Sequence, residues 1–495
     1  MQETTKKKIL LFFILLLFSC FLYGSYLTMH YASDTYNIIN VGYEQYAIYW
    51  SFIDGRIVMG LIGLVANLLS IPINIYVILL TFLALVISSF VVMVIRSMVL
   101  EIKPIQNKKT EWILNTICFL CIFHFMYMEN LHYVESIVMA LSLLFYVLAT
   151  KQLLKNTKFR LWKTFGLLIL GVMCYQGTIG LFFAFTFVMT LISKQNKIKQ
   201  VMKILLECGL LGLAAALVNV GEVKLIEVFL GVEQTRLGQL GQFFYRLGYI
   251  FTHIDDVFIK TAHLFPPYLL LAFVLTILTT VWCYVWMAKK EKRILLDVFF
   301  ITIVTILSSF VIFIITLSSF YTGRLHFCMG ALVGLLFLYL YAKTDCFENK
   351  SVLQKILLVI LLAYFILNVY NVLTITWQHK KVNQLERKQV ESIEKQIKQY
   401  EEEADIAVQN IGIITIGNQL QKAYFKQIPN LSVLSYNSVR CDWAADGVIN
   451  YYTGRKLKKK SLTKAQKQEI LMQMSKQNRD YICLEDTLYI ATYMY

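Results

Sequence analysis

Long apolar runs recur along the chain, and short polar segments separate them. The first run extends from Ile9 to Met29 and follows three lysines at positions 6–8. A helix needs about 20 mostly apolar residues to cross the hydrocarbon core of a bilayer. Further runs lie near residues 71–95, 112–128, 135–150, 164–174, 178–193, 202–219, 266–287, 295–317, 326–342 and 353–375. The pattern therefore predicts an all-α polytopic membrane protein with about eleven transmembrane helices.

Composition supports this class. The 495 residues are 58% hydrophobic and 16% charged, whereas a soluble globular chain is about half apolar and a quarter charged. These values exclude a soluble enzyme, a disordered chain and a disulfide scaffold. A formal net charge of +16 would suggest nucleic acid as a partner in a soluble domain. Here the basic residues fall mostly between apolar runs, where they set topology, so no nucleic-acid partner is expected.

The basic segments predict the orientation, because cytoplasmic loops concentrate Lys and Arg. The basic segments 96–109, 151–163, 194–203 and 289–293 all fall on the side of the N-terminus if there are eleven spans. Segments 31–56, 129–135, 175–177 and 318–327 fall on the other side and contain only Arg56 and Arg324 as basic residues. We therefore expect a multi-pass protein of the cell membrane with a cytoplasmic N-terminus. The first run lacks a clear cleavage site and is expected to be retained.

Two stretches fit this scheme less simply. Ile57–Ser70 is apolar but short, and counting it as a span would put the basic segment 96–109 outside. We expect a juxtamembrane or re-entrant helix there, and whether it spans the membrane stays open. The run 164–193 has basic segments at both ends and a break at Tyr175-Gln176-Gly177. This predicts two short helices joined by an outward-facing turn.

Residues 1–375 thus form the expected membrane domain, and residues 376–495 form an expected extracytoplasmic domain. The latter opens with a polar helix-like stretch, and IGIITIG, LSVLSY, VINYY and YICLED then predict short strands in a small α/β or α+β domain. Cys441 and Cys483 both lie there, so a disulfide is permitted, although spacing does not establish it. The basic run 455–460 is typical of a solvated face, with an anionic glycan or lipid surface as the alternative.

Ionisable residues gather on the expected outer side, whereas the spans are nearly free of charge. Ionisable groups at membrane depth are unfavourable and usually mark a pathway or a site. Asp34 could act as a general base on an acceptor hydroxyl, and Arg56 could hold a phosphate leaving group. Equally, Asp34 could cap a short helix and Arg56 could extend to lipid headgroups. Composition alone favours the second interpretation.

The stretch SDTYNIINVGYEQYAIYWSFIDGRIVMGLIGL has an acidic residue just after the first span and, some 20 residues later, a Trp followed by DGR. It resembles the bacterial type II serotype-specific glucosyltransferases. These are multispan enzymes of the GT-C class, which move a sugar from a polyprenyl-phosphate carrier to a surface polysaccharide outside the membrane. The resemblance is strongest over residues 30–80, is weaker at the 175–177 break and does not include residues 376–495. It implies that Asp34 is the base or essential carboxylate and that Asp54, Gly55 and Arg56 match the DGR of the family.

The chain departs from that family at Ser33-Asp34, where the family usually has two adjacent acids. A carboxylate pair would need Asp54 or Glu44 as its second member, brought close by a fold of the loop. The few acidic residues favour metal-free catalysis, with a divalent cation, Mg²⁺ or Mn²⁺, as the alternative.

Five more residues are candidate substrate ligands. His132 and Glu135, three residues apart, could form an acid–base or ligand pair on one helix face, or an interfacial cap. Tyr175 and Gln176 could bind sugar hydroxyls or satisfy backbone groups freed by the break. Arg324 could be a second phosphate ligand or an interfacial residue.

Together these features predict an outward-facing GT-C glycosyltransferase. Its donor would be a polyprenyl-phosphate-linked sugar, its acceptor a surface polysaccharide and its surroundings membrane lipid, with inversion at the anomeric carbon. A surface polysaccharide polymerase or ligase acting on lipid-linked oligosaccharides is the alternative. A flippase or transporter of lipid-linked sugar is less favoured, because such proteins carry charged residues within their spans.

Overall fold

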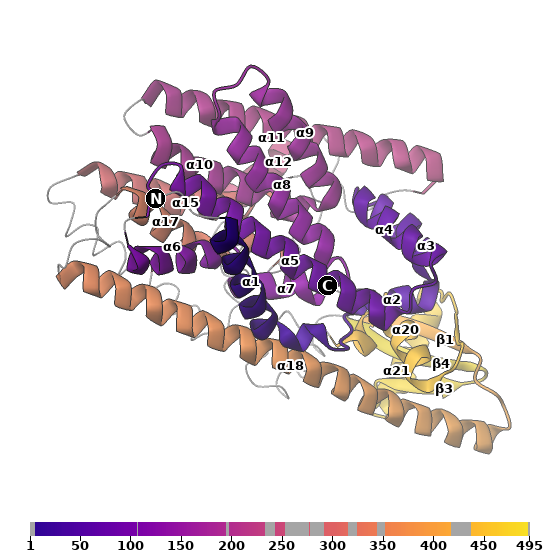
Figure 1. The fold of residues 1–495 in the computed structure, drawn as a ribbon. Helices are drawn as coiled ribbons and strands as arrows, with labels where there is room; N and C mark the ends of the chain where they lie inside the picture. Colours follow the sequence, from indigo (N-terminus) through magenta and orange to yellow (C-terminus); the bar gives the residue numbers. More distant parts are fainter. Residues whose placement is uncertain are drawn as a thin grey trace.

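The computed structural model describes residues 5–105, 107–194, 198–232, 243–252, 292–314, 324–343, 352–416 and 437–493, together with residue 277. These residues are mostly helical and carry a small sheet near the C-terminus (Figure 1). The α-helices before the long helix α18 are α1 (Thr5–Leu22), α2 (Ser33–Val41), α3 (Tyr43–Tyr46), α4 (Ile57–Leu68), α5 (Ile73–Leu100), α6 (Lys108–Leu120), α7 (Tyr127–His132), α8 (Ser136–Leu154), α9 (Arg160–Cys174), α10 (Gly180–Lys194), α11 (Ile198–Leu230), α12 (Phe243–Thr252), α15 (Lys292–Ser308), α16 (Phe327–Gly330) and α17 (Leu332–Lys343). The 3-10 helices η1 (Gly24–Leu27), η3 (Gln176–Thr178) and η5 (Val311–Ile314) and the π-helix η2 (Ala47–Phe52) lie between them.

Six helical segments of the described chain are long and apolar enough to cross a membrane. They are Ile73–Leu100, Ser136–Leu154, Gln176–Ser193, Ile198–Leu230, Leu296–Phe313 and Lys355–Ala404. This agrees with the expected class of polytopic membrane protein, but the expected count of eleven spans is not confirmed. The expected span at 266–287 lies outside the described residues.

The other expected spans are shorter or interrupted. α1 ends at Leu22, before the expected end at Met29, and η1 follows it. The run expected at 112–128 is divided between α6 and α7, since α6 ends at Leu120. α9 has 15 residues, and α17 is a short apolar helix of 12 residues. α4 also has 12 residues, a length that fits a juxtamembrane or re-entrant helix better than a span.

The break predicted at Tyr175-Gln176-Gly177 is confirmed. α9 ends at Cys174, Tyr175 is extended, and α10 starts at Gly180 after the short turn η3. Gly177 is needed for close packing, because a Cβ there would lie 2.6 Å from the side chains of Leu325 and Tyr175. The break is therefore a packed turn.

The largest hydrophobic core joins α1, α5, α6, α10, α17 and the apolar half of α18. α11 is less buried than the helices of this core, because only 28% of its most apolar stretch of 18 residues is buried inside the protein. Leu206, Leu210 and Leu217 are among its exposed side chains. An apolar surface of this kind suits contact with lipid hydrocarbon.

α18 (Val352–Ala404) is a continuous helix of 53 residues. Its first half is apolar, and its second half is the polar stretch predicted to be helical. The expected boundary between residues 375 and 376 therefore lies inside this helix. Figure 1 shows α18 in orange, running along the helical body and then beyond it to the yellow sheet.

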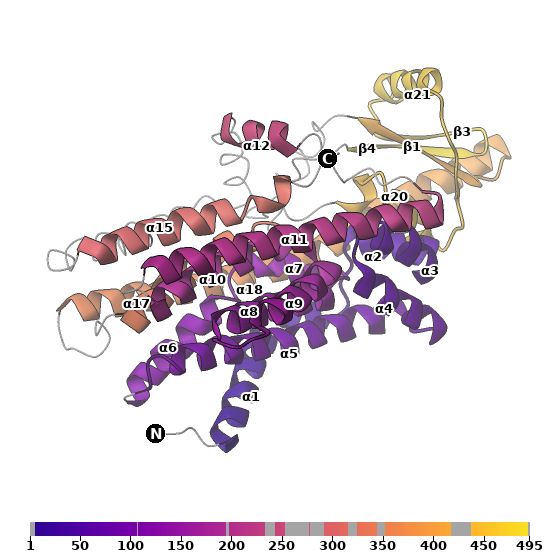
Figure 2. The same ribbon diagram turned by 90° about the horizontal axis from the view of Figure 1, so that it is seen from above.

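The C-terminal sheet contains β1 (Asn410–Ile416), β2 (Lys458–Lys459), β3 (Tyr481–Leu484) and β4 (Thr487–Tyr493), in the order β2-β1-β4-β3. β1 is parallel to both β2 and β4, whereas β3 and β4 form an antiparallel hairpin. η6 (Ser438–Arg440), α20 (Ala445–Thr453) and α21 (Lys464–Lys476) complete the domain. Figure 2 shows α20 and α21 on opposite sides of the sheet.

Two of the predicted strands are confirmed, since IGIITIG contains most of β1 and YICLED contains β3. LSVLSY lies outside the described residues. The prediction for VINYY was wrong, because these residues belong to α20. The helix buries Val448 and Ile449 and ends at Gly454, whose φ of 72° is a left-handed conformation that glycine adopts easily. Cys441 and Cys483 are both free thiols, so the permitted disulfide is not present.

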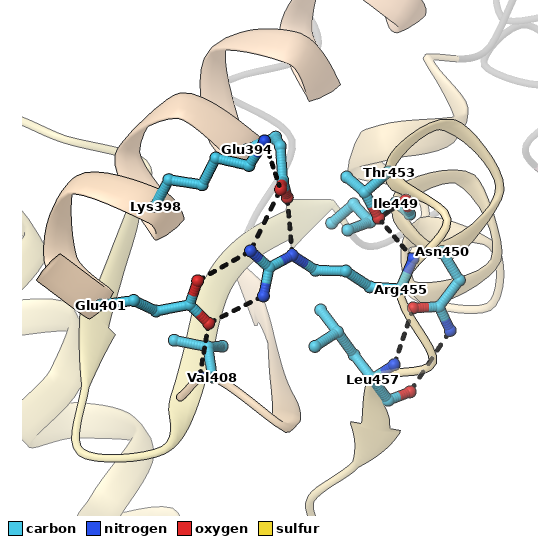
Figure 3. Close-up of polar contacts among 9 residues, drawn as sticks. All are labelled: Glu394, Lys398, Glu401, Val408, Ile449, Asn450, Thr453, Arg455 and Leu457. Carbon is cyan, nitrogen blue, oxygen red and sulfur yellow. Dashed lines mark hydrogen bonds and ion pairs between the residues drawn. The ribbon is translucent and has the colours of Figure 1, made fainter. Parts of the chain in front are cut away.

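Arg455 fastens the loop after α20 to the polar half of α18 (Figure 3). Its Nε and Nη2 donate to Glu394 at 2.7 and 3.1 Å, and its Nη1 and Nη2 donate to Glu401 at 2.8 and 2.9 Å. These hydrogen bonds raise the pKa of Arg455 above its ordinary value. Arg455 therefore serves the domain structure, whereas Lys458 and Lys459 of the same basic run are exposed.

We expect Arg455→Ala to destabilise the C-terminal domain by about 1–3 kcal/mol, because two carboxylates of α18 lose their shared cation. Hydrogen exchange of the β1 amides measures this change. Arg387→Ala is the matched control, since Arg387 pairs with Glu391 on the exposed surface of the same helix. Equal β1 exchange in the two variants would contradict the assignment.

Candidate functional site

The first outer segment places Asp34 in the first turn of α2. Ala32 is the N-cap residue of this helix. The interpretation that Asp34 caps a short helix is therefore wrong. Asp34 still lies in the first turn of α2, where an acidic side chain interacts favourably with the helix dipole. Asp34 is partly buried and interacts electrostatically with Tyr46 and Arg324.

The Asp54-Gly55-Arg56 turn leads into α4 and is held from two sides. Gln176 Nε2 donates to the carbonyl oxygen of Asp54 at 2.8 Å, and Asn219 Nδ2 donates to that of Gly55 at 3.3 Å. Gly55 has a φ of 71°, and a Cβ there would lie 2.8 Å from Gln176 Nε2. Glycine is therefore required at this position by conformation and by space. Gln176 thus binds the backbone of the distant Asp54 turn and the side chain of Asn219, whereas the expected bond to backbone groups freed by the break is not what these contacts show.

Arg56 forms an ion pair with Glu135 instead of extending to lipid headgroups. Its Nη1 lies 2.5 Å from both carboxylate oxygens of Glu135, and its Nη2 lies 3.5 Å from Asp54. Burial would lower the pKa of Arg56, but these two carboxylates raise it above its ordinary value. Tyr46 also donates to Glu135, at 3.3 Å. The guanidinium is already largely neutralised by protein carboxylates.

Arg324 is differently placed. Its guanidinium carbon lies 4.0 Å from the ring centroid of Tyr133, and its backbone N–H donates to Glu129 at 2.7 Å. Within the described part of the chain, its buried Nη1 makes no hydrogen bond. Burial would lower its pKa, but Tyr175, Tyr133, Glu129 and Asp34 raise it above its ordinary value. Arg324 is therefore a partly buried cation whose buried Nη1 is available to donate a hydrogen bond.

Tyr175 lies between the two arginines. The guanidinium carbon of Arg56 is 5.3 Å from its ring centroid, and both arginines influence its ionisation electrostatically. Burial raises the pKa of Tyr175 to about 12, so the phenol stays neutral and can donate a hydrogen bond. The structure thus gathers seven predicted site residues around one centre: Asp34, Asp54, Arg56, Glu135, Tyr175, Gln176 and Arg324.

Two predicted site residues lie elsewhere. Glu44 is exposed on α3 and does not face this centre. Of the two interpretations of His132 and Glu135, a pair on one helix face is wrong, because α7 ends at His132, Tyr133 is extended, and α8 begins only at Ser136. Glu135 is the N-cap residue of α8, but its side chain makes no capping hydrogen bond. Because the chain changes direction between α7 and α8, Glu135 contacts Arg56, whereas His132 lies in a separate cluster.

That cluster contains His30, His132, His379 and Tyr26. The ring of His132 lies 4.3 Å from that of His379 and 5.7 Å from that of His30. Tyr26 hydrogen-bonds Nδ1 of His379, and Nδ1 of His30 pairs with the carbonyl oxygen of Thr28 at 3.1 Å. Lys380 and Arg324 are the nearby cations, and Glu129 faces Tyr26. All three imidazoles are buried.

We expect this cluster to make the protein less stable in acid. Burial lowers the pKa of His30 from 6.5 to about 4. Between pH 6.5 and about 4, His30 is protonated in the unfolded chain but neutral in the folded chain. The free energy of unfolding therefore falls as the pH drops through this range. His30 alone contributes a loss of about 2 kcal/mol at pH 5.

Melting temperatures in detergent from pH 7 to pH 5 test this expectation, with His30→Gln as the comparison. The variant should lose less stability than the wild type on acidification. Parallel losses in the two proteins would exclude His30 as a cause.

Sequence reasoning missed Tyr46, Glu129, Tyr133 and Asn219 as parts of the site. Glu129 is the first residue of the outer segment 129–135, in which only His132 and Glu135 are given roles from the sequence. Tyr46 and Tyr133 stand in a chain with 30 tyrosines, so composition gave no reason to select them. Asn219, a polar residue near the end of the apolar part of α11, could have been noticed from the sequence.

Divalent metal ions fit this centre poorly. Asp54 and Glu135 both face the guanidinium of Arg56, so a metal ion bound by these carboxylates would lie beside a positive charge. Among the described residues, no group of three or more His, Cys, Asp or Glu side chains could hold a metal ion. We derive no catalytic step through a metal.

Comparisons with protein-family models, with curated protein sequences and with solved structures give no match.

Proposed function

We propose that the protein is a membrane glycosyltransferase that moves a sugar from a polyprenyl-phosphate carrier to a cell-surface polysaccharide on the extracytoplasmic side. The resemblance of residues 30–80 suggests glucose as the sugar. The observation that carries the proposal is that the Asp34 carboxylate is close enough to act electrostatically on Arg324, whose Nη1 makes no hydrogen bond among the described residues and which also interacts electrostatically with Tyr175. A base and a phosphate ligand in one partly buried centre are the parts that this reaction needs.

The two arginines have different roles in this proposal. Arg324 is the principal phosphate ligand, because its Nη1 has no hydrogen-bond partner among the described residues. Arg56 is a positioning residue, because Glu135 and Asp54 already pair with the two terminal nitrogens of its guanidinium and only its buried Nε makes no hydrogen bond among the described residues. This assignment replaces the expectation that Arg56 is the first phosphate ligand. Tyr175 could donate a further hydrogen bond to the phosphate or to a sugar hydroxyl.

The reaction follows from these roles. Asp34 takes the proton of an acceptor hydroxyl, and the oxygen attacks the anomeric carbon of the donor sugar. The bond from that carbon to the phosphate oxygen breaks, and its electron pair stays on the carrier phosphate. Arg324 stabilises the charge that develops on the leaving group. Attack opposite the phosphate would invert the anomeric configuration.

The surface glycan of cells expressing wild type or Arg324→Ala tests the proposal. We expect the variant to lose one glycosyl substituent, to keep the polymer backbone and to accumulate the lipid-linked sugar. Arg479→Ala is the control, since Arg479 is an exposed arginine of the C-terminal domain. Protein levels in the membrane are matched by immunoblot.

Other results would point elsewhere. Shortened polymer in the Arg324→Ala cells would favour a polymerase or ligase. An unchanged glycan, with the protein present at normal level, would remove Arg324 from the catalytic centre.

A further inference from the structure

The segment that carries Asp34 packs against both the C-terminal domain and the candidate site. Tyr31 and Tyr36, on either side of Asp34, are buried in the hydrophobic core of the C-terminal domain. Ala32 packs instead with Tyr133 and Tyr175 of the candidate site. The core that holds the two tyrosines also contains Val390, Ile393, Val439, Val448, Ile449 and Leu488. α2 therefore joins the C-terminal domain to the catalytic centre.

Polar contacts from α18 fix the chain just before Asp34. Asn383 accepts a hydrogen bond from the Tyr31 backbone N–H at 2.9 Å and donates to the Tyr31 carbonyl oxygen at 2.8 Å. It also donates to Glu386 at 2.9 Å. Glu386 in turn accepts from the Tyr36 hydroxyl at 3.3 Å and from the Ser438 backbone at 2.6 Å. One side chain of α18 thus pairs with both backbone groups of a residue three positions before Asp34.

α20 fixes the same helix from the other side. A Cβ on Gly447 would lie only 2.3 Å from the Tyr36 carbonyl oxygen, so the two backbones touch. Asn40 donates to Asp446 at 2.8 Å, and Asn450 donates to Asn40 at 3.1 Å. Figures 1 and 2 both show α2 lying beside α20. The contact allows no side chain at position 447.

α2 has only nine residues, and a helix of this length is not stable by itself in water. Its place is therefore set by what packs against it. A displacement of about 1 Å in a reacting group can reduce a rate about 100-fold. The contacts of α18 and α20 are thus sufficient to decide whether Asp34 reaches the acceptor hydroxyl.

We infer that the C-terminal domain is a positioning element of the catalytic centre, in which Asn383 and Gly447 hold α2 so that Asp34 faces Arg324. The catalytic half of this inference rests on the proposed function, whereas the structural half does not. The domain has this role in addition to any contact with the acceptor glycan.

Gly447→Ala and Asn383→Ala test the inference in the full-length protein in lipid nanodiscs. We expect backbone amides of α2 to exchange about ten-fold faster in both variants, with β1 and α8 unchanged. Gly166→Ala is the matched control, since a Cβ on that residue of α9 meets no described atom within 4 Å. Where transfer is measured, we expect kcat to fall about 10-fold to 100-fold with an unchanged KM for the polyprenyl-phosphate sugar.

The outcomes separate the two claims. Unchanged exchange of α2 in both variants would overturn the positioning role, and so would faster exchange without any loss of kcat. If β1 also exchanges faster in Gly447→Ala, this substitution has destabilised the C-terminal domain itself. The exchange of α2 in Asn383→Ala then decides whether the positioning role holds. If the wild type transfers no sugar, the proposed function fails, while the exchange of α2 still decides the structural half.

Discussion

Replacing Asp34 with asparagine is expected to abolish sugar transfer and to leave the protein folded. Asparagine has nearly the same shape as aspartate but cannot take a proton from the acceptor hydroxyl. Loss of a general base typically reduces the rate about 10²-fold to 10⁴-fold. The measurement is the rate of sugar transfer to the surface polysaccharide, normalised to the amount of protein in the membrane.

A matched substitution separates this effect from a general loss of acidic charge. Asp405→Asn also removes one carboxylate, but Asp405 is exposed and has a φ of 56°, which asparagine tolerates well. This control should transfer sugar at the wild-type rate. A transfer rate for Asp34→Asn within about two-fold of the wild type would exclude Asp34 as the base.

Glu135→Ala is expected to destabilise the protein by about 3–5 kcal/mol, which is the largest structural effect that we predict. The Glu135 side chain is 1% exposed and that of Arg56 is 15% exposed, so the ion pair is buried. Removing the carboxylate leaves the Arg56 guanidinium with Asp54, at 3.5 Å, as its remaining ion-pair partner among the described residues, and it also removes the hydrogen-bond acceptor of Tyr46. The measurement is the melting temperature in detergent.

Two comparisons complete this test. Glu135→Gln should lose less stability, because an amide oxygen can still accept hydrogen bonds from Arg56 and Tyr46. Glu101→Ala should melt like the wild type, since the Glu101 side chain is 61% exposed where it pairs with Lys151. Equal melting of Glu135→Ala and Glu101→Ala would contradict a structural role for the buried pair.

Several features could be predicted from the sequence because they depend on neighbouring residues. The break at Tyr175 was visible because polar residues and a glycine interrupt a long apolar run. The strands β1 and β3 lie in short runs rich in isoleucine and leucine. The gathering of ionisable residues outside the apolar runs also led to most members of the candidate site.

Other features could not be predicted, because they depend on contacts between distant segments. Polarity indicates the depth of a residue in the membrane but not its direction around the bundle. Glu135 therefore gave no sign that it would meet Arg56, which lies 79 positions earlier. In the same way, Tyr31 and Tyr36 are close in sequence to the first apolar run but pack in the C-terminal domain.

The continuity of α18 has a related cause. Composition changes from apolar to polar near residue 375, which suggested a domain boundary. Both halves are nevertheless good helix formers with no Pro or Gly between them, so the helix continues to Ala404. A change of composition marks a change of surroundings more reliably than the end of a helix.

The central claim is that this chain catalyses sugar transfer from a polyprenyl phosphate. The most direct test is purified full-length protein in nanodiscs, given polyprenyl phosphates that carry glucose, galactose or mannose, with polysaccharide from the native cell surface as acceptor. We predict that one donor is consumed, that the polysaccharide gains that sugar and that Asp34→Asn does neither. Folded wild-type protein that consumes none of these donors would contradict the claim.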